Sequence, residues 1–496
     1  MHYRPEIDGL RTIAVVPVIL FHAGFTVFSG GYVGVDVFFV ISGYLITSIL
    51  LAELEAGNFS IARFYERRAR RILPALFVVL LVTSIFAALW MPPSFFKDFS
   101  KSVVAVVVFA SNFLFWKQAG YFDAAADFKP LLHTWSLAVE EQYYVVFPLF
   151  LAAVWRFGRN RVFLAILVLA LLSLGLSQWA SHHKPSANFY LAPTRAWELL
   201  AGSLCAFLTV ARRARSNNAL ALLGLALIVV PIFWFDDTTP FPGLYALAPV
   251  GGAGLIIMFA AKGTWVARLL STRPFVGIGL ISYSAYLWHQ PMFALARIRS
   301  LTPPSMWTMA GLSLAAVALA YLTWALIEQP VRQRRVPLLR SRAAIFTASV
   351  CCGLAFIGLG LLGYVTKGLP QRFPGEAVAQ IEAARDDIGV YRVPCITGHL
   401  EGGIGDTTCI LGKAGRDSLD FVLLGDSFAA ALADGMNVAA QNLGLRGAIY
   451  SMHACPPLLG VGGWWPDTQA VCDRMQDGMV AEITAAAPQV VFLHAS

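Results

Sequence analysis

An arginine and a histidine stand near the two ends of the first apolar stretch of this chain, GLRTIAVVPVILFH. His22 follows Arg11 by eleven residues, and eleven steps of about 100° on an α-helix return to within about 20° of the starting direction while advancing about 16 Å. The spacing therefore predicts a helix that presents both side chains on one face. The histidine could take a proton or carry an acyl group, and the arginine could bind an anionic ligand or simply anchor the helix end at a membrane interface.

Other ionisable side chains lie inside apolar stretches, where they are costly unless they are paired or line a cavity. Arg195 and Glu198 are three residues apart, which favours a structural ion pair on one helical face. Adjacent Glu140 and Glu141 cannot share a helical face, so at most one of them would approach His22, and the other would face a neighbouring helix or water. The other polar residues in or beside these stretches are Asp36, Ser42, Tyr283, Tyr286 and His289, of which the last three could equally belong to an interfacial aromatic belt.

Four arginines occur close together in the segment ERRARR, at Arg67, Arg68, Arg70 and Arg71. Such a cluster can simply fix the orientation of membrane spans. It can also bind a phosphate-rich ligand at the mouth of a helical bundle. A histidine reached from this mouth along a polar path would suit proton abstraction or acyl transfer with a phosphorylated donor such as an acyl-CoA. We therefore take Arg11 and these four arginines as candidate donor-binding residues.

The composition places these residues in a membrane protein. Of 496 residues, 57% are hydrophobic and 13% are charged, and the mean hydropathy is +0.65, which is too apolar for an ordinary soluble protein. We predict a polytopic α-helical membrane bundle of about eleven spans. The apolar stretches of spanning length are 10–28, 35–52, 72–91, 138–155, 162–179, 196–211, 218–235, 244–261, 275–295, 306–327 and 343–364.

A further apolar segment, 100–116, is short. If it crossed the membrane, every later arginine-rich loop would change sides, so we expect it to be re-entrant or interfacial and packed against protein.

The formal net charge of +8 resides largely in arginine-rich connections between the apolar stretches. With a cytoplasmic N-terminus, all of these connections fall on the cytoplasmic side, which is the positive-inside pattern. The charge therefore needs no nucleic-acid partner, and the sequence contains no nucleic-acid module. We predict a multi-pass protein of the inner (cytoplasmic) membrane, in which everything after Tyr364 lies in the periplasm or an equivalent extracytoplasmic space.

Four of the seven cysteines follow the last predicted span, at Cys395, Cys409, Cys455 and Cys472. Their position in a loop-rich segment indicates an oxidising compartment and two disulfides. Three pairings are possible, and we favour Cys395 with Cys409 and Cys455 with Cys472. Zinc is the alternative, but no Cys-x-x-Cys or His-x-x-His spacing supports it, and we expect no metal.

Six motifs in one order resemble the membrane acyltransferase-3 family. They are the Arg11–His22 spacing, GGYVGVDVFFVISGYL, HTWSLAVEEQYY, RAWELLAG, SYSAYLWHQP and EQP, and they cover residues 1 to about 335. The resemblance implies that an acyl group, typically acetyl, passes from a cytoplasmic acyl-CoA such as acetyl-CoA to a carbohydrate hydroxyl. The acceptor would be an envelope polysaccharide of the O-antigen, exopolysaccharide or peptidoglycan type, or its lipid-linked precursor.

The same resemblance implies which residues act. Arg11, His22 and either Glu140 or Glu141 fall on the family's functional positions. Arg11 would contact the phosphate or pantetheine part of the donor. His22 could be the general base on the acceptor hydroxyl or a transient acyl carrier, and the sequence does not choose between these roles.

The C-terminal segment resembles an SGNH hydrolase-type domain. In FVLLGDSFAAAL, an apolar strand leads into a helix, and Gly425, Asp426 and Ser427 occupy the turn. Such a turn exposes the serine hydroxyl beside a helix N-terminus, which favours a developing oxyanion. The resemblance thus implies catalytic roles for Ser427 and Asp426.

This segment also departs from the SGNH pattern. Neither the Asp-x-x-His pair nor the Gly-x-Asn block of that family appears after Ser427, although His453 and His494 are possible bases. We expect either a truncated chain or an inactive serine module. Truncation is favoured, because the chain ends in VVFLHAS, where a buried core strand would finish.

The predicted organisation has four parts: a transmembrane acyltransferase domain over 1–335, an additional linking transmembrane helix over 336–365, an extracytoplasmic linker over 366–417 and a partial SGNH-like α/β domain over 418–496. The membrane part would move the acyl group across the bilayer, and the C-terminal domain would deliver it or aid delivery. Two alternatives remain. A transporter or flippase would show inverted repeats, which we do not find. A membrane-tethered esterase that uses only Ser427 would tolerate replacement of His22.

Overall fold

The computed structural model describes residues 3–119, 126–211, 216–236, 238–300, 302–375, 409–413, 418–451, 457–458, 472–473, 476–477, 479–480, 483–484 and 487–494. The chain divides into two compact units, Met1–Pro370 and Gln371–Ser496. The first unit contains the predicted membrane part, and the second contains the predicted SGNH-like segment.

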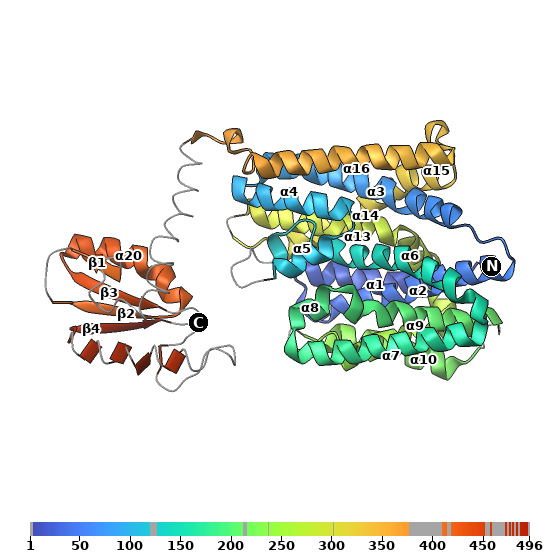
Figure 1. Ribbon diagram of the computed structural model, residues 1–496, viewed down its shortest axis with the longest axis horizontal. Helices are drawn as coiled ribbons and strands as arrows, with labels where there is room; N and C mark the ends of the chain where they lie inside the picture. The colour runs from blue at the N-terminus through green and yellow to red at the C-terminus, as the bar shows by residue number, and fades with distance from the viewer. Residues whose placement is uncertain are drawn as a thin grey trace. The chain divides into compact units, whose positions relative to one another are not determined.

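The first unit is a bundle of α-helices whose long members run alongside one another (Figure 1). Each of the predicted apolar stretches overlaps one of these helices. In chain order the helices are α1 (Pro5–His22), α2 (Gly34–Glu55), α3 (Ile61–Trp90), α4 (Pro93–Val107), α5 (Ser111–Lys117), α6 (Thr134–Val154), α7 (Arg159–His183), α8 (Pro185–Tyr190), α9 (Ala192–Ala211), α10 (Asn218–Trp234), α11 (Leu247–Phe259), α12 (Trp265–Leu270), α13 (Arg273–Arg299), α14 (Met306–Thr323), α15 (Gln329–Arg332) and α16 (Arg342–Val365).

Several of these helices are long and apolar enough to cross a membrane, so the predicted helical membrane part is confirmed. The predicted count of about eleven spans is larger than the number that meets this standard. Within the part of the chain that the structure describes, six segments do so: Gly31–Glu55, Ile61–Trp90, Thr134–Phe157, Arg159–His183, Met306–Arg332 and Arg342–Val365.

The short apolar segment 100–116 forms no long helix. α4 ends at Val107 and α5 begins at Ser111, and between them Phe109 has a left-handed backbone with φ of 52°. α4 packs along α16, where Gly360 leaves room for the side chain of Val104. This segment therefore packs against protein, as the sequence analysis expects.

Glycines allow the central helices to approach closely. α1 and α2 lie in the middle of the bundle, between α13 on one side and α9 on the other (Figure 1). A Cβ atom on Gly279 of α13 would lie 1.8 Å from the carbonyl oxygen of Asp8, and a Cβ on Gly43 of α2 would lie 1.8 Å from that of Leu199 in α9. Since no side chain fits at either contact, these glycines set the spacing of α1 to α13 and of α2 to α9.

A buried ion cluster joins α2 to α9. The Arg195 guanidinium lies 3.1 Å from a carboxylate oxygen of Asp36 and 3.2 Å from one of Glu198, and all three side chains are at most 1% exposed. The predicted Arg195–Glu198 ion pair is therefore confirmed, with Asp36 as a second acidic partner. Four aromatic rings surround the guanidinium at 5.4–5.9 Å, those of Phe39, Trp135, Phe189 and Phe241.

Three arginine-rich connections meet at one end of the bundle. Arg159, the first residue of α7, forms an ion pair with the last residue of α2. Arg67, near the start of α3, pairs with Glu53 in the last turn of α2. Arg70 donates hydrogen bonds to the backbone carbonyls of residues 339–341, directly before α16. Arginines of three connections thus lie together at this end.

The second unit contains a small sheet of β1 (Ile410–Gly412), β2 (Phe421–Gly425), β3 (Arg446–Ser451) and β4 (Val490–His494), with helix α20 (Ser427–Leu443) between β2 and β3. The strand order is β1-β3-β2-β4. β2 is parallel to both β3 and β4, and β1 is antiparallel to β3. The predicted strand, turn and helix of an α/β domain are therefore confirmed.

One expectation for this sheet is wrong. The sequence predicted that the chain finishes on a buried core strand, but the apolar side chains of β4 are 40–55% exposed. β2 is buried at every position, as expected for a central parallel strand, whereas β4 is the last strand in the described order and nothing described covers it.

The cysteines of the second unit are only partly described. Cys472 is disulfide-bonded, as the expectation of disulfides in this segment requires. Cys395 and Cys455 lie outside the described residues, so the predicted pairing stays a prediction.

Candidate active site

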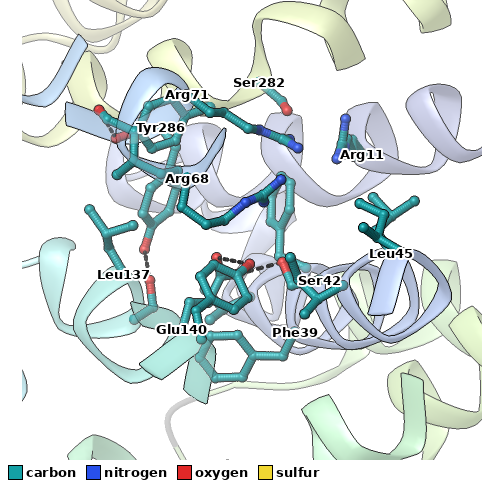
Figure 2. A pocket seen from close by; sticks show the side chains of 18 residues that line it. Arg11, Phe39, Ser42, Leu45, Arg68, Arg71, Leu137, Glu140, Ser282 and Tyr286 are labelled. Carbon is teal, nitrogen blue, oxygen red and sulfur yellow. Dashed lines mark hydrogen bonds between the residues drawn. The ribbon is translucent and has the colours of Figure 1, made fainter. Parts of the chain in front are cut away.

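Three arginines and a glutamate face one cavity of the first unit (Figure 2). The cavity encloses about 160 Å³, and its walls come from α1, α2, α3, α6 and α13. Arg11 reaches it from α1, Arg68 and Arg71 from α3, and Glu140 from α6. The structure thus brings together four of the residues that the sequence analysis singled out.

The arginines of this cavity differ in their partners. Arg11 forms an ion pair of 2.9 Å with Asp8. Arg68 and Arg71 form no ion pair with any residue that the structure describes, and the buried Nε of Arg68 has no hydrogen-bond partner there. Figure 2 shows the three guanidinium groups directed into the cavity. Two half-buried cations without a carboxylate partner make this cavity suitable for an anionic ligand.

Glu140 is held in place by two hydroxyl groups. Its carboxylate accepts a hydrogen bond of 3.0 Å from Ser42 in α2 and one of 3.2 Å from Tyr144, one turn further along α6. Ser136, one turn earlier on the same face of α6, hydrogen-bonds the hydroxyl of Tyr286 at 2.8 Å. Glu140 therefore faces the arginines with a fixed orientation, and a Ser136–Tyr286 pair borders the cavity.

His22 lies outside the cavity lining, at the C-terminal end of α1. Its Nδ1 is 3.0 Å from the carbonyl oxygen of Val18 and 3.2 Å from Nε2 of His289 in α13. The ring of His133, which directly precedes α6, lies 5.2 Å from that of His289. Tyr286 connects the cavity to this group, since it lines the cavity and donates a hydrogen bond of 2.9 Å to the carbonyl of His133.

The structure places three other predicted site residues away from the cavity. Arg67 forms an ion pair of 2.9 Å with Glu53, and Arg70 forms one of 3.0 Å with Glu66. Glu141 is buried elsewhere, and one of its carboxylate oxygens has no hydrogen-bond partner among the described residues. The roles predicted for Arg67, Arg70 and Glu141 stay predictions.

The predicted serine site lies in the second unit. Asp426 occupies the turn after β2 and is buried, and Ser427 is the first residue of α20, although its side chain lies outside the described residues. His453 also lies outside them. Gly425 pairs with His494 across β2 and β4, and a Cβ there would lie 1.7 Å from the His494 carbonyl oxygen, so only glycine fits at this strand end. The roles of Asp426 and Ser427 stay predictions.

Sequence reasoning missed the Ser136–Tyr286 hydrogen bond that borders the cavity and the packing of the His133 ring against His289. Both lie in quoted motifs, but the contacts join residues more than 100 positions apart, and no periodicity links them. Among the residues that the structure describes, no three His, Cys, Asp or Glu side chains are arranged to hold a metal ion.

Comparison with known proteins decides the family. Residues 4–325 match the acyltransferase domain family, and residues 394–496 match an SGNH domain that occurs fused to such domains. The chain belongs to the acyltransferase family. The resemblance drawn from its motifs is thereby confirmed, including the C-terminal SGNH module.

Relatives of this acyltransferase-family chain are named as O-acetyltransferases. It is 32% identical over 351 residues to the peptidoglycan O-acetyltransferase OatA of Listeria monocytogenes. The matched region covers 67% of this chain and 56% of that protein. It is 32% identical over 349 residues to the putative peptidoglycan O-acetyltransferase YrhL of Bacillus subtilis, covering 66% and 55%. The chain spans a little over half the length of these relatives. No solved structure matches it.

Proposed function

We propose that this chain is an O-acetyltransferase that takes an acetyl group from acetyl-CoA at the cytoplasmic side of the membrane and transfers it to a hydroxyl of an envelope polysaccharide. The observation that carries the proposal is the pair of arginines, Arg68 and Arg71, that have no carboxylate partner among the described residues and are directed into one cavity. The names of two relatives favour peptidoglycan over lipopolysaccharide as the acceptor.

The cavity suits the phosphate-bearing part of the donor. Guanidinium groups bind phosphate through paired, charge-assisted hydrogen bonds, which are about twice as strong as neutral ones. Arg68 and Arg71 would bind the phosphates, and Arg11, already paired with Asp8, would contact the donor nearby. Because Arg67 and Arg70 are engaged in other ion pairs, we assign no donor contact to them.

The orientation follows from the charge distribution. Arginine-rich connections mark the cytoplasmic side of membrane proteins, and here they meet at one end of the bundle, to which α3 brings Arg67 and Arg70. We propose that all eleven predicted stretches cross the inner membrane, so that helices α1, α9, α10, α11 and α13 also span it. An odd number of crossings then leaves the second unit in the extracytoplasmic space.

His22 would serve the acceptor side of the reaction. It lies outside the cavity that contains the arginines, so we assign it the role of general base toward the acceptor hydroxyl. His22 takes the hydroxyl proton as the oxygen bonds to the acetyl carbon. The bond from that carbon to sulfur breaks, the sulfur keeps the electron pair, and the proton then passes from His22 to the thiolate.

Two further groups complete the proposal. We propose that Glu140, rather than Glu141, is the functional glutamate, because only Glu140 lines the cavity. In the second unit, Ser427, at the start of α20 and next to Asp426, would take the acetyl group from the ester formed in this step and pass it to the polysaccharide hydroxyl.

The test is the amount of ester-linked acetyl in cell-wall polysaccharide, released by mild base, in a host that lacks its own O-acetyltransferase. Wild type is compared with His22→Ala and Ser427→Ala, and with His183→Ala, which alters an exposed histidine at the end of α7. We expect His22→Ala to abolish acetylation at an unchanged membrane level, while His183→Ala acetylates normally. Normal acetylation by His22→Ala would refute the proposal and favour an esterase that uses only Ser427.

A further inference from the structure

Three histidines from distant parts of the chain meet beside the proposed acceptor site. His22 ends α1, His289 lies within α13, and His133 directly precedes α6. The ring centroids of His22 and His289 are 5.1 Å apart, and those of His133 and His289 are 5.2 Å apart. His289 is fully buried, whereas His22 is only half-buried. A buried histidine that hydrogen-bonds the proposed base can determine which ring nitrogen of that base carries the hydrogen.

The hydrogen-bond partners fix which nitrogen of each ring carries the hydrogen. Nδ1 of His289 lies 2.6 Å from the backbone carbonyl oxygen of Tyr286, which can only accept, so Nδ1 must be the donor. A neutral imidazole carries one hydrogen, so Nε2 of His289 has a lone pair. That lone pair faces Nδ1 of His22 at 3.2 Å and can only accept from it.

The same reasoning then applies to His22. Its Nδ1 donates to Nε2 of His289 and to the carbonyl oxygen of Val18, 3.0 Å away. Nε2 of His22 therefore has no hydrogen and makes no hydrogen bond within the described residues. This tautomer is the one that a base needs, since Nε2 can receive a proton only while its lone pair is free.

We propose that His289 is a positioning residue for His22: by accepting the Nδ1 hydrogen it holds the tautomer whose Nε2 can take the proton of the acceptor hydroxyl. This rests on the proposed function, in which His22 is the base. When His22 gains that proton and becomes charged, its bond to His289 becomes charge-assisted and stabilises the imidazolium. The Val18 carbonyl, one turn back on the same helix, also accepts this hydrogen, but it is at the same time the regular i−4 acceptor of a backbone N–H of the helix, so it holds the tautomer less firmly than His289 does.

His133 offers a matched comparison in the same cluster. It is 1% exposed, and neither of its ring nitrogens has a hydrogen-bond partner among the described residues. Its contacts with His289 and Tyr286 are made by the ring edges and faces. Phenylalanine can reproduce ring packing but not hydrogen bonding, so the same substitution should have different effects at the two positions.

The test measures acetyl transfer from radiolabelled acetyl-CoA to peptidoglycan in membrane vesicles that contain the full chain. We expect His289→Phe to lower kcat tenfold to a hundredfold with KM for acetyl-CoA unchanged. His289→Gln, whose amide oxygen can accept from His22, should recover part of the rate, and His133→Phe should retain the rate within about threefold. Full activity of His289→Phe would overturn the proposal.

A second measurement reports the tautomer without activity. Solid-state NMR of protein with isotope-labelled histidine nitrogens, compared with the His22→Ala spectrum, identifies the signals of His22. We expect hydrogen on Nδ1 in wild type and in His289→Gln, and a mixture of tautomers in His289→Phe. Hydrogen on Nε2 of His22 in wild type would refute the assignment. Normal acetylation by His22→Ala would instead refute the proposed function itself. The NMR spectrum reports the tautomer independently of activity, so it separates that failure from failure of the positioning role.

Discussion

Replacing Arg71 by glutamine tests the donor site most directly. Arg71 reaches the cavity from α3 and has no ion pair with any described residue, so the substitution removes a charge without leaving a carboxylate unpaired. A hydrogen bond to a charged group contributes about 1.5–3 kcal/mol. At about 1.4 kcal/mol for each factor of ten, Arg71→Gln should weaken acetyl-CoA binding tenfold to a hundredfold.

Arg67→Gln is the matched control. Arg67 lies one turn earlier on the same helix, is paired with Glu53 and does not line the cavity. Arg67 carries the same charge as Arg71, so Arg67→Gln would reveal any effect of the lost net charge alone on acetyl-CoA binding. We expect it to change the affinity for acetyl-CoA by less than about twofold, since surface ion pairs contribute roughly 0–1 kcal/mol.

The assay is equilibrium binding of radiolabelled acetyl-CoA to the purified chain, repeated with S-acetylpantetheine, which has no phosphate. Arg71→Gln should weaken only the binding of acetyl-CoA. Equal weakening of both ligands would show that Arg71 does not bind the phosphates. An affinity for acetyl-CoA that does not change at all, or that falls equally in Arg67→Gln, would refute the assignment of the cavity to the donor.

Three further outcomes follow from the packing and charges of the first unit. Gly279→Ala should destabilise the protein by about 1–3 kcal/mol in thermal unfolding, because its Cβ would meet a backbone oxygen at 1.8 Å, while Gly277→Ala on the same helix, where nothing lies within 4 Å, should not. Arg195→Met leaves two buried carboxylates without a cation and should cost about 3–5 kcal/mol, so that little folded protein elutes in size-exclusion chromatography, whereas Glu198→Gln leaves one ion pair and should be tolerated better. Glu140→Gln should bind acetyl-CoA at least as tightly as wild type, because the substitution removes a negative charge from the cavity. It should transfer acetyl at least about tenfold more slowly than wild type. Equal transfer rates would show that this carboxylate takes no part in the chemistry.

Patterns that depend on neighbouring residues could be predicted from the sequence. The apolar stretches gave the helices, and the three-residue spacing gave the Arg195–Glu198 ion pair. The helical period also divides ERRARR into two faces. Arg68 and Arg71 are three residues apart and line the cavity, while Arg67 and Arg70, also three apart, form other ion pairs. Periodicity separates the faces, but only tertiary packing determines which one meets the cavity.

Contacts between distant elements could not be predicted in this way. Nothing within α1 indicates that His22 meets a histidine of α13, because that contact depends on how the two helices pack along each other. The exposure of β4 has a similar origin. An apolar strand such as VVFLH is buried only where another layer covers it, and the run itself does not show whether that layer is present.

The length of α1 limits which acetyl donor can serve both parts of the site. Arg11 lines the cavity that would bind the anionic part of the donor, and His22, eleven residues on, stands about 16 Å further along the same helix. In acetyl phosphate the acetyl group is bonded directly to the phosphate, so a molecule bound by the arginines would leave its acetyl group far from His22. In acetyl-CoA a flexible arm separates the phosphates from the thioester. The spacing between arginine and histidine therefore favours acetyl-CoA, and acetyl phosphate should neither support transfer nor compete well for the cavity.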